Sequence, residues 1–160
     1  MRNLKHAAHK LYEQFIRLKG NPHQIALGFS LGLLIGMTPF IGVHIISSMI
    51  LASLLRWNKI SAVIGVNITN VGTAPLIYPV NYWVGRRLVG VSSNVKWSMT
   101  LDYPEMLNLM KHSPQIFADL LFGGLILGIP LAIAGYFLAL KVIHLSRKRV
   151  VLSSSNHTIS

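Results

Sequence analysis

Residues 28–44 read Gly28-Phe-Ser-Leu-Gly32-Leu-Leu-Ile-Gly36-Met-Thr38-Pro39-Phe-Ile-Gly42-Val-His44, an apolar run interrupted in its middle by threonine, proline and glycine. A second run of the same character reads Asn67-Ile-Thr-Asn70-Val-Gly72-Thr73-Ala-Pro75-Leu-Ile-Tyr78-Pro79. Proline removes a backbone donor and clashes with the preceding turn, so a helix ends or kinks there. We therefore expect two helical segments, broken at Pro39 and Gly42 and at Pro75 and Pro79.

Interrupted apolar helices of this kind are typical of membrane proteins. In hydrocarbon, a broken helix is tolerated only where protein or a water-filled cavity satisfies the freed backbone groups. Two broken segments in corresponding positions indicate a site near the bilayer midplane. We predict that this site is a polar cluster of Thr38, His44, Asn67, Asn70, Thr73 and Tyr78.

The composition agrees with a bilayer environment. Only 12% of the residues are charged and 52% are apolar, whereas soluble domains carry about 25% charged residues. Residues 20–55, 60–85 and 120–140 contain no Asp, Glu, Lys or Arg, and each stretch reaches the roughly 20 apolar residues that cross a bilayer. We expect an all-α, polytopic membrane protein, and the broken segments are either full crossings or re-entrant hairpins.

The chain divides into three parts. Residues 1–20 have apolar side chains at three- and four-residue steps with basic ones between them, which predicts an amphipathic interfacial helix. Residues 21–145 form the membrane-embedded domain, which begins with Asn21-Pro22 as N-cap and first helical position and includes a clear span at 120–140. Residues 146–160 are basic and Ser-rich, and we predict that this tail is disordered.

Small residues recur at four-residue steps in two places. Gly28, Gly32 and Gly36 form the first stripe, and Gly124 and Gly128 begin the second. Such stripes let another helix backbone approach closely in a membrane, although glycine is also simply frequent in membrane helices. We predict helix packing at both stripes. A homo-oligomer is a further expectation, because so few helices bury little surface alone.

The net charge of +11 indicates which partners to expect. The bases flank the apolar runs, a placement that sets membrane orientation and attracts anionic headgroups. Nucleic-acid binding would instead need a basic face with stacking aromatics. We therefore expect the lipid bilayer and its anionic headgroups as partners and no nucleic acid. Both ends of the chain are basic, which predicts that both termini are cytoplasmic.

Catalytic and metal-binding chemistry is not expected. The four carboxylates lie outside the broken segments, at Glu13, Asp102, Glu105 and Asp119. His44 alone cannot supply the two positioned groups of general acid–base catalysis. His6 and His9 lack the third and fourth ligands of a zinc site, and the chain contains no cysteine. We predict no enzyme activity, no catalytic residue, no metal and no cofactor.

The order of several short motifs resembles a bacterial membrane family. The motifs are Ala26-x-Gly28-x-x-x-Gly32, Pro39-x-x-Gly42-x-His44, Leu55-x-x-Asn58, Asn70-x-x-Thr73-x-Pro75-x-x-Tyr78 and Gly85. In these residues the chain is similar to domain of unknown function 2062, although Val71 stands where that family often has proline. The resemblance implies a bacterial integral membrane protein without an established activity, sometimes attached to or near glycosyltransferase-like domains. We predict a multi-pass protein of the bacterial inner membrane.

Two kinds of function follow from these features. The first is transport or lipid handling, in which half-helix N-termini around the midplane cluster would bind an anionic group such as a lipid phosphate. The alternative is a non-catalytic scaffold or anchor that recruits a membrane or peripheral protein such as a glycosyltransferase. Convergence of the cluster on a water-accessible cavity would favour transport, and a dry core bonded internally would favour the scaffold.

Overall fold

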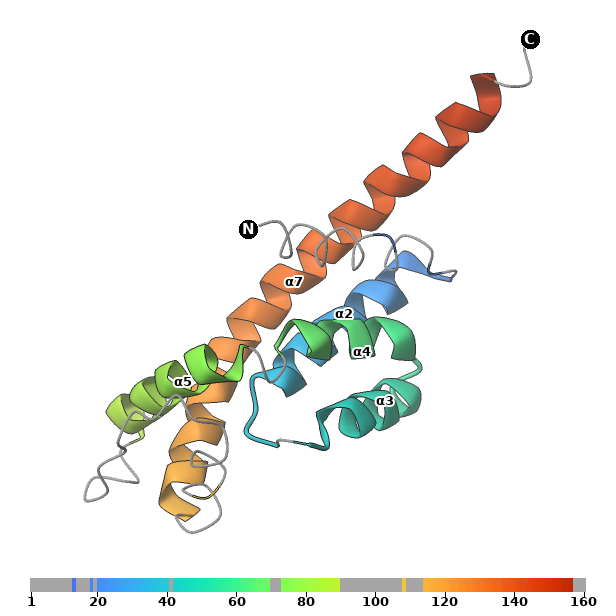
Figure 1. Cartoon of the computed structure of the whole chain (residues 1–160). Helices are drawn as coiled ribbons and strands as arrows, with labels where there is room; N and C mark the ends of the chain where they lie inside the picture. The colour runs from blue at the N-terminus through green and yellow to red at the C-terminus, as the bar shows by residue number, and fades with distance from the viewer. Residues whose placement is uncertain are drawn as a thin grey trace.

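The protein is all-helical over the residues that the computed structural model describes, which are 13, 18, 20–40, 42–69, 73–89, 108 and 114–156. Its helices are α2 (Pro22–Gly36), α3 (His44–Leu54), α4 (Lys59–Ile68), α5 (Ala74–Leu88) and α7 (Pro114–Asn156). Figure 1 shows α7 as a long rod, with α2 beside its middle, α4 packed on α2, and α5 crossing α7 nearer its N-terminal end. The predicted all-α class is confirmed. The interfacial helix predicted at residues 1–20 lies largely outside the described residues.

Helix α2 begins where the sequence predicts a helix start. Asn21 is the N-cap, and its side-chain oxygen accepts a hydrogen bond from the backbone N–H of His23 at 3.0 Å. Pro22 follows at the first helical position, where a missing N–H has no consequence. The helix ends at Gly36, and both Pro39 and Gly42 lie between α2 and α3. Gly42 has a φ of 89°, a left-handed conformation that glycine adopts readily.

The second interruption begins earlier in the sequence than Pro75 and Pro79, from which we predicted it. Helix α4 ends at Ile68, and α5 begins at Ala74 with Pro75 in its first turn. Helix α5 then continues through Pro79, so the structure corrects the prediction of a break at this residue. An internal proline removes one helical hydrogen bond, and here the packing of α5 against α7 outweighs that loss.

Helices α2 and α4 pack backbone against backbone. The backbone contacts pair Gly28 with Asn58, Gly32 with Ala62, and Gly65 with Phe29, and Gly36 lies against the Thr69 side chain. A Cβ atom built on Gly32 would overlap the carbonyl oxygen of Ala62, so a larger residue would push the helices apart. The order of the pairs means that α2 and α4 run in the same direction. The first glycine stripe is therefore used within the chain.

Helices α2 and α3 form a hairpin whose two ends lie together. After α3 the chain returns to the start of α2, where Asn58 donates its backbone N–H to the carbonyl of Gln24 at 3.1 Å. Nearby, the buried hydroxyl of Ser61 donates to the carbonyl of Ile25 at 2.6 Å. The Asn58 side chain also caps α4 by accepting from the Ser61 N–H at 2.9 Å. These bonds fasten the α3–α4 turn to the first turn of α2.

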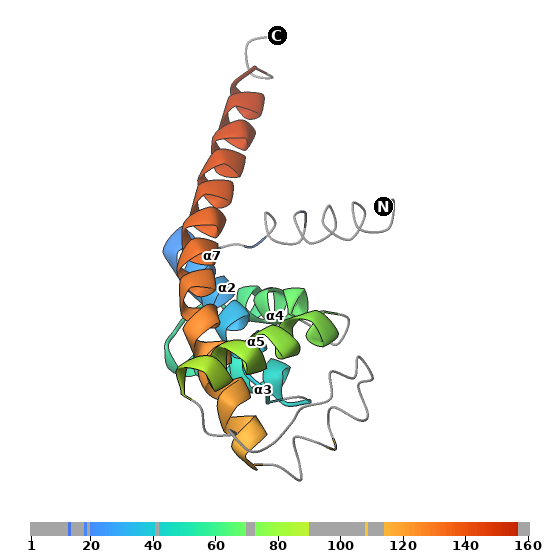
Figure 2. The same cartoon turned by 90° about the vertical axis from the view of Figure 1, so that its left-hand side faces the viewer.

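Helix α7 supports both α2 and α5. One apolar cluster joins it to α2 and α4 and comprises Ile25, Ala26, Ile64, Ala139 and Ile143. Another joins it to α5 and comprises Ala74, Tyr78, Tyr82, Ile116 and Leu120. Gly124 of the second stripe lies against the carbonyl of Met37, and Gly128 lies against the side chains of Leu34 and Met37. Figure 2 shows α5 passing across α7 rather than along it.

Among the described residues, one helix is long and apolar enough to cross a membrane. It covers Pro114–Arg147 with a mean hydropathy of 2.2, whereas α2, α3 and α4 are apolar but shorter. The span predicted at 120–140 lies within it. Helix α7 continues to Asn156, within the tail for which we predicted disorder, and residues 157–160 lie outside the described residues. Each residue added to an existing helix gains a hydrogen bond. In addition, Arg147 anchors this part of α7 by donating to the carbonyl of Gly20 at 2.6 Å.

The glycine contact between α2 and α4 predicts that the free energy of unfolding depends strongly on side-chain size at the contact. We expect Gly32→Ala to lower the free energy of unfolding in detergent by about 1–3 kcal/mol, because the added methyl group overpacks the crossing. Ala134→Val is the control, since it adds more volume at an exposed position of α7 and should change stability by less than about 0.5 kcal/mol. Equal effects of the two substitutions in a denaturant titration would contradict the backbone contact.

Candidate functional site

The backbone carbonyl of Thr38 is the meeting point of the two interrupted segments. His44 places Nε2 at 2.8 Å from this oxygen, and the Tyr78 hydroxyl donates to it at 3.4 Å. With its proton on Nε2, His44 is also a donor. Carbonyls at a helix C-terminus lack partners within the helix, and the two side chains supply them here. Three of the six predicted cluster residues, Thr38, His44 and Tyr78, therefore come together.

A second carbonyl of the same break is bonded by a residue that sequence reasoning missed. Asn81 is 1% exposed, and its Nδ2 donates to the carbonyl of Met37 at 2.8 Å. Because a carbonyl only accepts, this bond identifies the nitrogen and leaves Oδ1 as the other amide atom. Oδ1 is buried and has no hydrogen-bond partner. Asn81 follows Tyr78 by three residues, so the shared helix face was the available signal.

The other predicted cluster residues have separate surroundings. Asn67 lies on the exposed side of α4, and its Nδ2 donates to the carbonyl of Val63, one turn earlier, at 2.8 Å. The Thr73 hydroxyl donates to the carbonyl of Ile68 at 3.3 Å, across the second break. Asn70 lies outside the described residues. The residues that come together are thus those that bond the carbonyls of Met37 and Thr38, just after α2, and Asn67 is not one of them.

A buried carboxylate lies where α5 crosses α7. Asp119 is fully buried, and its backbone carbonyl lies so close to Gly85 that a Cβ there would overlap it. One turn further along α7, Gly123 lies against the backbone carbonyl of Asn81 in the same way. The sequence indicated only that Asp119 lies outside the broken segments. Its burial follows from the close crossing that Gly85 and Gly123 permit.

The polar side chains at this junction hold the backbone of the first break in place and offer few reactive groups. His44, Tyr78 and Asn81 each direct a donor to a backbone carbonyl of the first break. Within the described ranges, no group of three His, Cys, Asp or Glu side chains could hold a metal. The buried Asn81 Oδ1 is an acceptor at this junction that has no hydrogen-bond partner.

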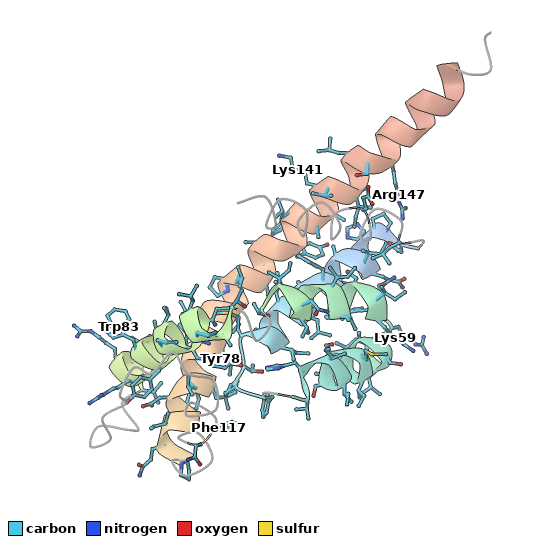
Figure 3. The ribbon with its side chains drawn as sticks, viewed as in Figure 1. Lys59, Tyr78, Trp83, Phe117, Lys141 and Arg147 are labelled. Atoms are coloured by element: carbon cyan, nitrogen blue, oxygen red, sulfur yellow. The ribbon has the colours of Figure 1, made fainter. Side chains whose placement is uncertain are left out.

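The outer surface of the helices is strongly apolar. Helix α3 buries Ser48 and Ala52, whereas Ile46 is 60% exposed and Leu54 is 74% exposed. Large apolar side chains are also exposed on α5 and α7, at Leu76, Val80, Trp83, Phe122, Ile129, Ile133, Phe137 and Leu138. Figure 3 shows Trp83 projecting away from the bundle. Apolar surface this extensive marks contact with a membrane or with another protein.

Two asparagines provide a matched test of the junction. Asn81→Ala should lower the free energy of unfolding by about 2 kcal/mol or more, because it empties a buried site and leaves the Met37 carbonyl without its donor. Asn67→Ala removes the same amide from an exposed position and should change stability by less than about 0.5 kcal/mol. A thermal or denaturant melt that ranks the two variants equally would contradict a structural role for Asn81.

Comparison with known proteins gives one match. The family described as "Uncharacterized protein conserved in bacteria (DUF2062)" matches residues 5–151. No curated protein and no solved structure matches the chain. The matched residues include both interruptions, the Thr38 junction and almost all of α7. The match spans far more than half of the sequence, and the chain therefore belongs to the bacterial family DUF2062.

Proposed function

We propose that this protein is a non-catalytic anchor, held within the bacterial inner membrane, that keeps a partner protein at the membrane. The observation that carries the proposal is the burial pattern of α3, which exposes its large apolar residues and buries Ser48 and Ala52. Lipid or a protein partner would cover the apolar side. The enzyme activity that the sequence argues against has no part in this proposal.

The exposed face of α3 is suited to hydrocarbon. Ile46, Ile50 and Leu54 follow one another at four-residue steps and are 60%, 54% and 74% exposed. Removing such side chains from water stabilises by about 25 cal/mol per Å² of apolar surface, or roughly 2 kcal/mol for each side chain. In water the same face would be a strong site of aggregation. A bilayer supplies the missing cover along the whole helix.

Helix lengths favour a re-entrant hairpin over two full crossings. The 15 residues of α2 and the 11 residues of α3 span about 22 and 16 Å, both less than the ~30 Å hydrocarbon core. The bond between Asn58 and Gln24 holds the two ends of the hairpin together. Backbone that is not helical can lie at membrane depth if protein satisfies it, and the bonds to the Met37 and Thr38 carbonyls satisfy two of its groups. In this proposal α7 is the full crossing.

The internal hydrogen bonds favour an anchor over a transporter. A transport site needs polar groups that can be released to a substrate, but His44, Tyr78 and Asn81 bond the protein's own backbone. Thr38 and Tyr78 are also buried. Because the glycine stripes are used between helices of one chain, a partner would have to bind elsewhere. The apolar face of α3 is the surface we propose for a membrane partner or a second copy.

Lipid handling is a second candidate, and one atom favours it. Asn81 Oδ1 is a buried acceptor without a partner, and it could bind a hydroxyl group of a substrate near the first break. Reconstitution in vesicles with labelled phospholipid separates the two functions. Transbilayer movement faster than in empty vesicles would favour lipid handling, whereas the anchor predicts none.

Single introduced cysteines can test the membrane arrangement, since the chain has no native cysteine. In native membranes we expect Lys59→Cys, at the α3–α4 turn, to react with a membrane-impermeant maleimide. We expect Ile50→Cys, in the middle of α3, to react only after solubilisation and denaturation, because lipid or a membrane partner covers it.

Both of these positions are exposed on the isolated chain, so their burial within the protein does not decide the outcome. Equal and rapid labelling at the two positions in intact membranes would remove the proposed placement of α3. Extraction of the native protein by alkaline carbonate would remove the membrane anchor altogether.

A further inference from the structure

We propose that Arg56, Lys59, Lys141 and Arg147 form a binding surface, here called the basic end, for the phosphate headgroups of anionic phospholipids. The inference rests on the proposed function, because it requires the protein to lie in a bilayer. It assigns a lipid class and a set of residues to one end of the bundle.

The fold brings Arg56, Lys59 and Arg147 to the start of α2 from separate parts of the sequence, and Lys141 precedes Arg147 on α7. Arg56 and Lys59 flank Asn58, whose backbone N–H is bonded to Gln24 at the start of α2. Arg147 is bonded to the carbonyl of Gly20, just before α2. Both contacts use the same region of α2, so the α3–α4 turn and the basic part of α7 lie beside one helix start. Figure 3 shows Arg147 toward the start of α2, Lys59 at the α3–α4 turn, and Lys141 on the side of α7 that faces away from α2.

Arg56 occupies a position that usually belongs to glycine. Its φ is 57°, in the left-handed region that disfavours residues with a Cβ. Arg56 donates its N–H to the carbonyl of Ser53 at 3.2 Å, and Trp57 donates to Ala52 at 2.8 Å. This pattern is the Schellman motif, in which the residue at the Arg56 position is commonly glycine. Glycine would suit this conformation better, and the positive charge is a property of Arg56 that glycine lacks.

The surroundings of the basic end match a phospholipid in both charge and polarity. The side chains of Arg56, Lys59 and Lys141 are exposed, and exposed cations near a membrane surface attract anionic headgroups. Leu54 and Leu55, which directly precede Arg56, are 74% and 47% exposed. Apolar side chains next to cations offer an acyl chain and a phosphate adjoining sites. Anionic phospholipid, rather than free phosphate, uses both.

The test places the wild-type protein and its variants in nanodiscs of phosphatidylcholine mixed with phosphatidylglycerol. Native mass spectrometry then measures which lipids stay bound to each protein after its release. We expect phosphatidylglycerol to be enriched on the wild-type protein over its share of the nanodisc. Lys59→Gln with Lys141→Gln should weaken its binding by about fivefold for each charge removed. Arg87→Gln is the control, because it also removes an exposed cation, but one that lies outside the basic end. Arg87 is on α5, two residues from the contact of Gly85 with Asp119.

Arg56→Gly separates headgroup binding from folding. Glycine suits the left-handed conformation, so the melting temperature should stay the same or rise while phosphatidylglycerol binding falls by about fivefold. Enrichment that is absent in the wild type, or unchanged in both Arg56→Gly and the double variant, would overturn the inference. Carbonate extraction of the same protein is measured in parallel. Retention in the membrane without enrichment removes only the basic end, whereas release into the soluble fraction removes the membrane anchor as well.

Discussion

The contact between the backbones of α2 and α4 is the constraint on which the rest of the structure depends. Glycine at positions 28, 32 and 65 removes the side chains that would separate the two helices. This close approach lets Ser61 reach the Ile25 carbonyl and lets Asn58 bond Gln24. Since α4 is held to the start of α2, α3 has to return along the hairpin. The two interruptions are then at the same end of the α2–α4 pair.

The interruptions create free carbonyl groups, and the way these are satisfied explains the shape of the site. The carbonyls of Met37 and Thr38 take donors from α3 and α5, through His44, Tyr78 and Asn81. Buried polar groups without partners are costly, more so in hydrocarbon. The inner polar residues are therefore largely committed to the fold, and the outer surface keeps the apolar residues. This distribution supports the proposed anchor.

The sequence predicted the features that depend on neighbouring residues in the chain. Asn21-Pro22 identified the start of α2, and the long apolar run identified the span within α7. It did not predict which polar residues would meet, because that depends on the bend between α2 and α3. Asn67 belongs to the same run as Tyr78 but lies on the exposed side of α4. Asn81, outside the quoted run, reaches the first break because α5 crosses α7 at glycines.

Spin labels at residues 24 and 59, measured in lipid vesicles, test the central claim most directly. The bond from Asn58 to Gln24 holds these positions close together, so we predict strong dipolar broadening of the spectrum. A second pair of labels, at residues 24 and 40, connects the base of the α2–α3 hairpin with its tip and should show no dipolar broadening. Absence of broadening for the first pair, in protein that is folded and inserted, would contradict the return of α3 to the start of α2.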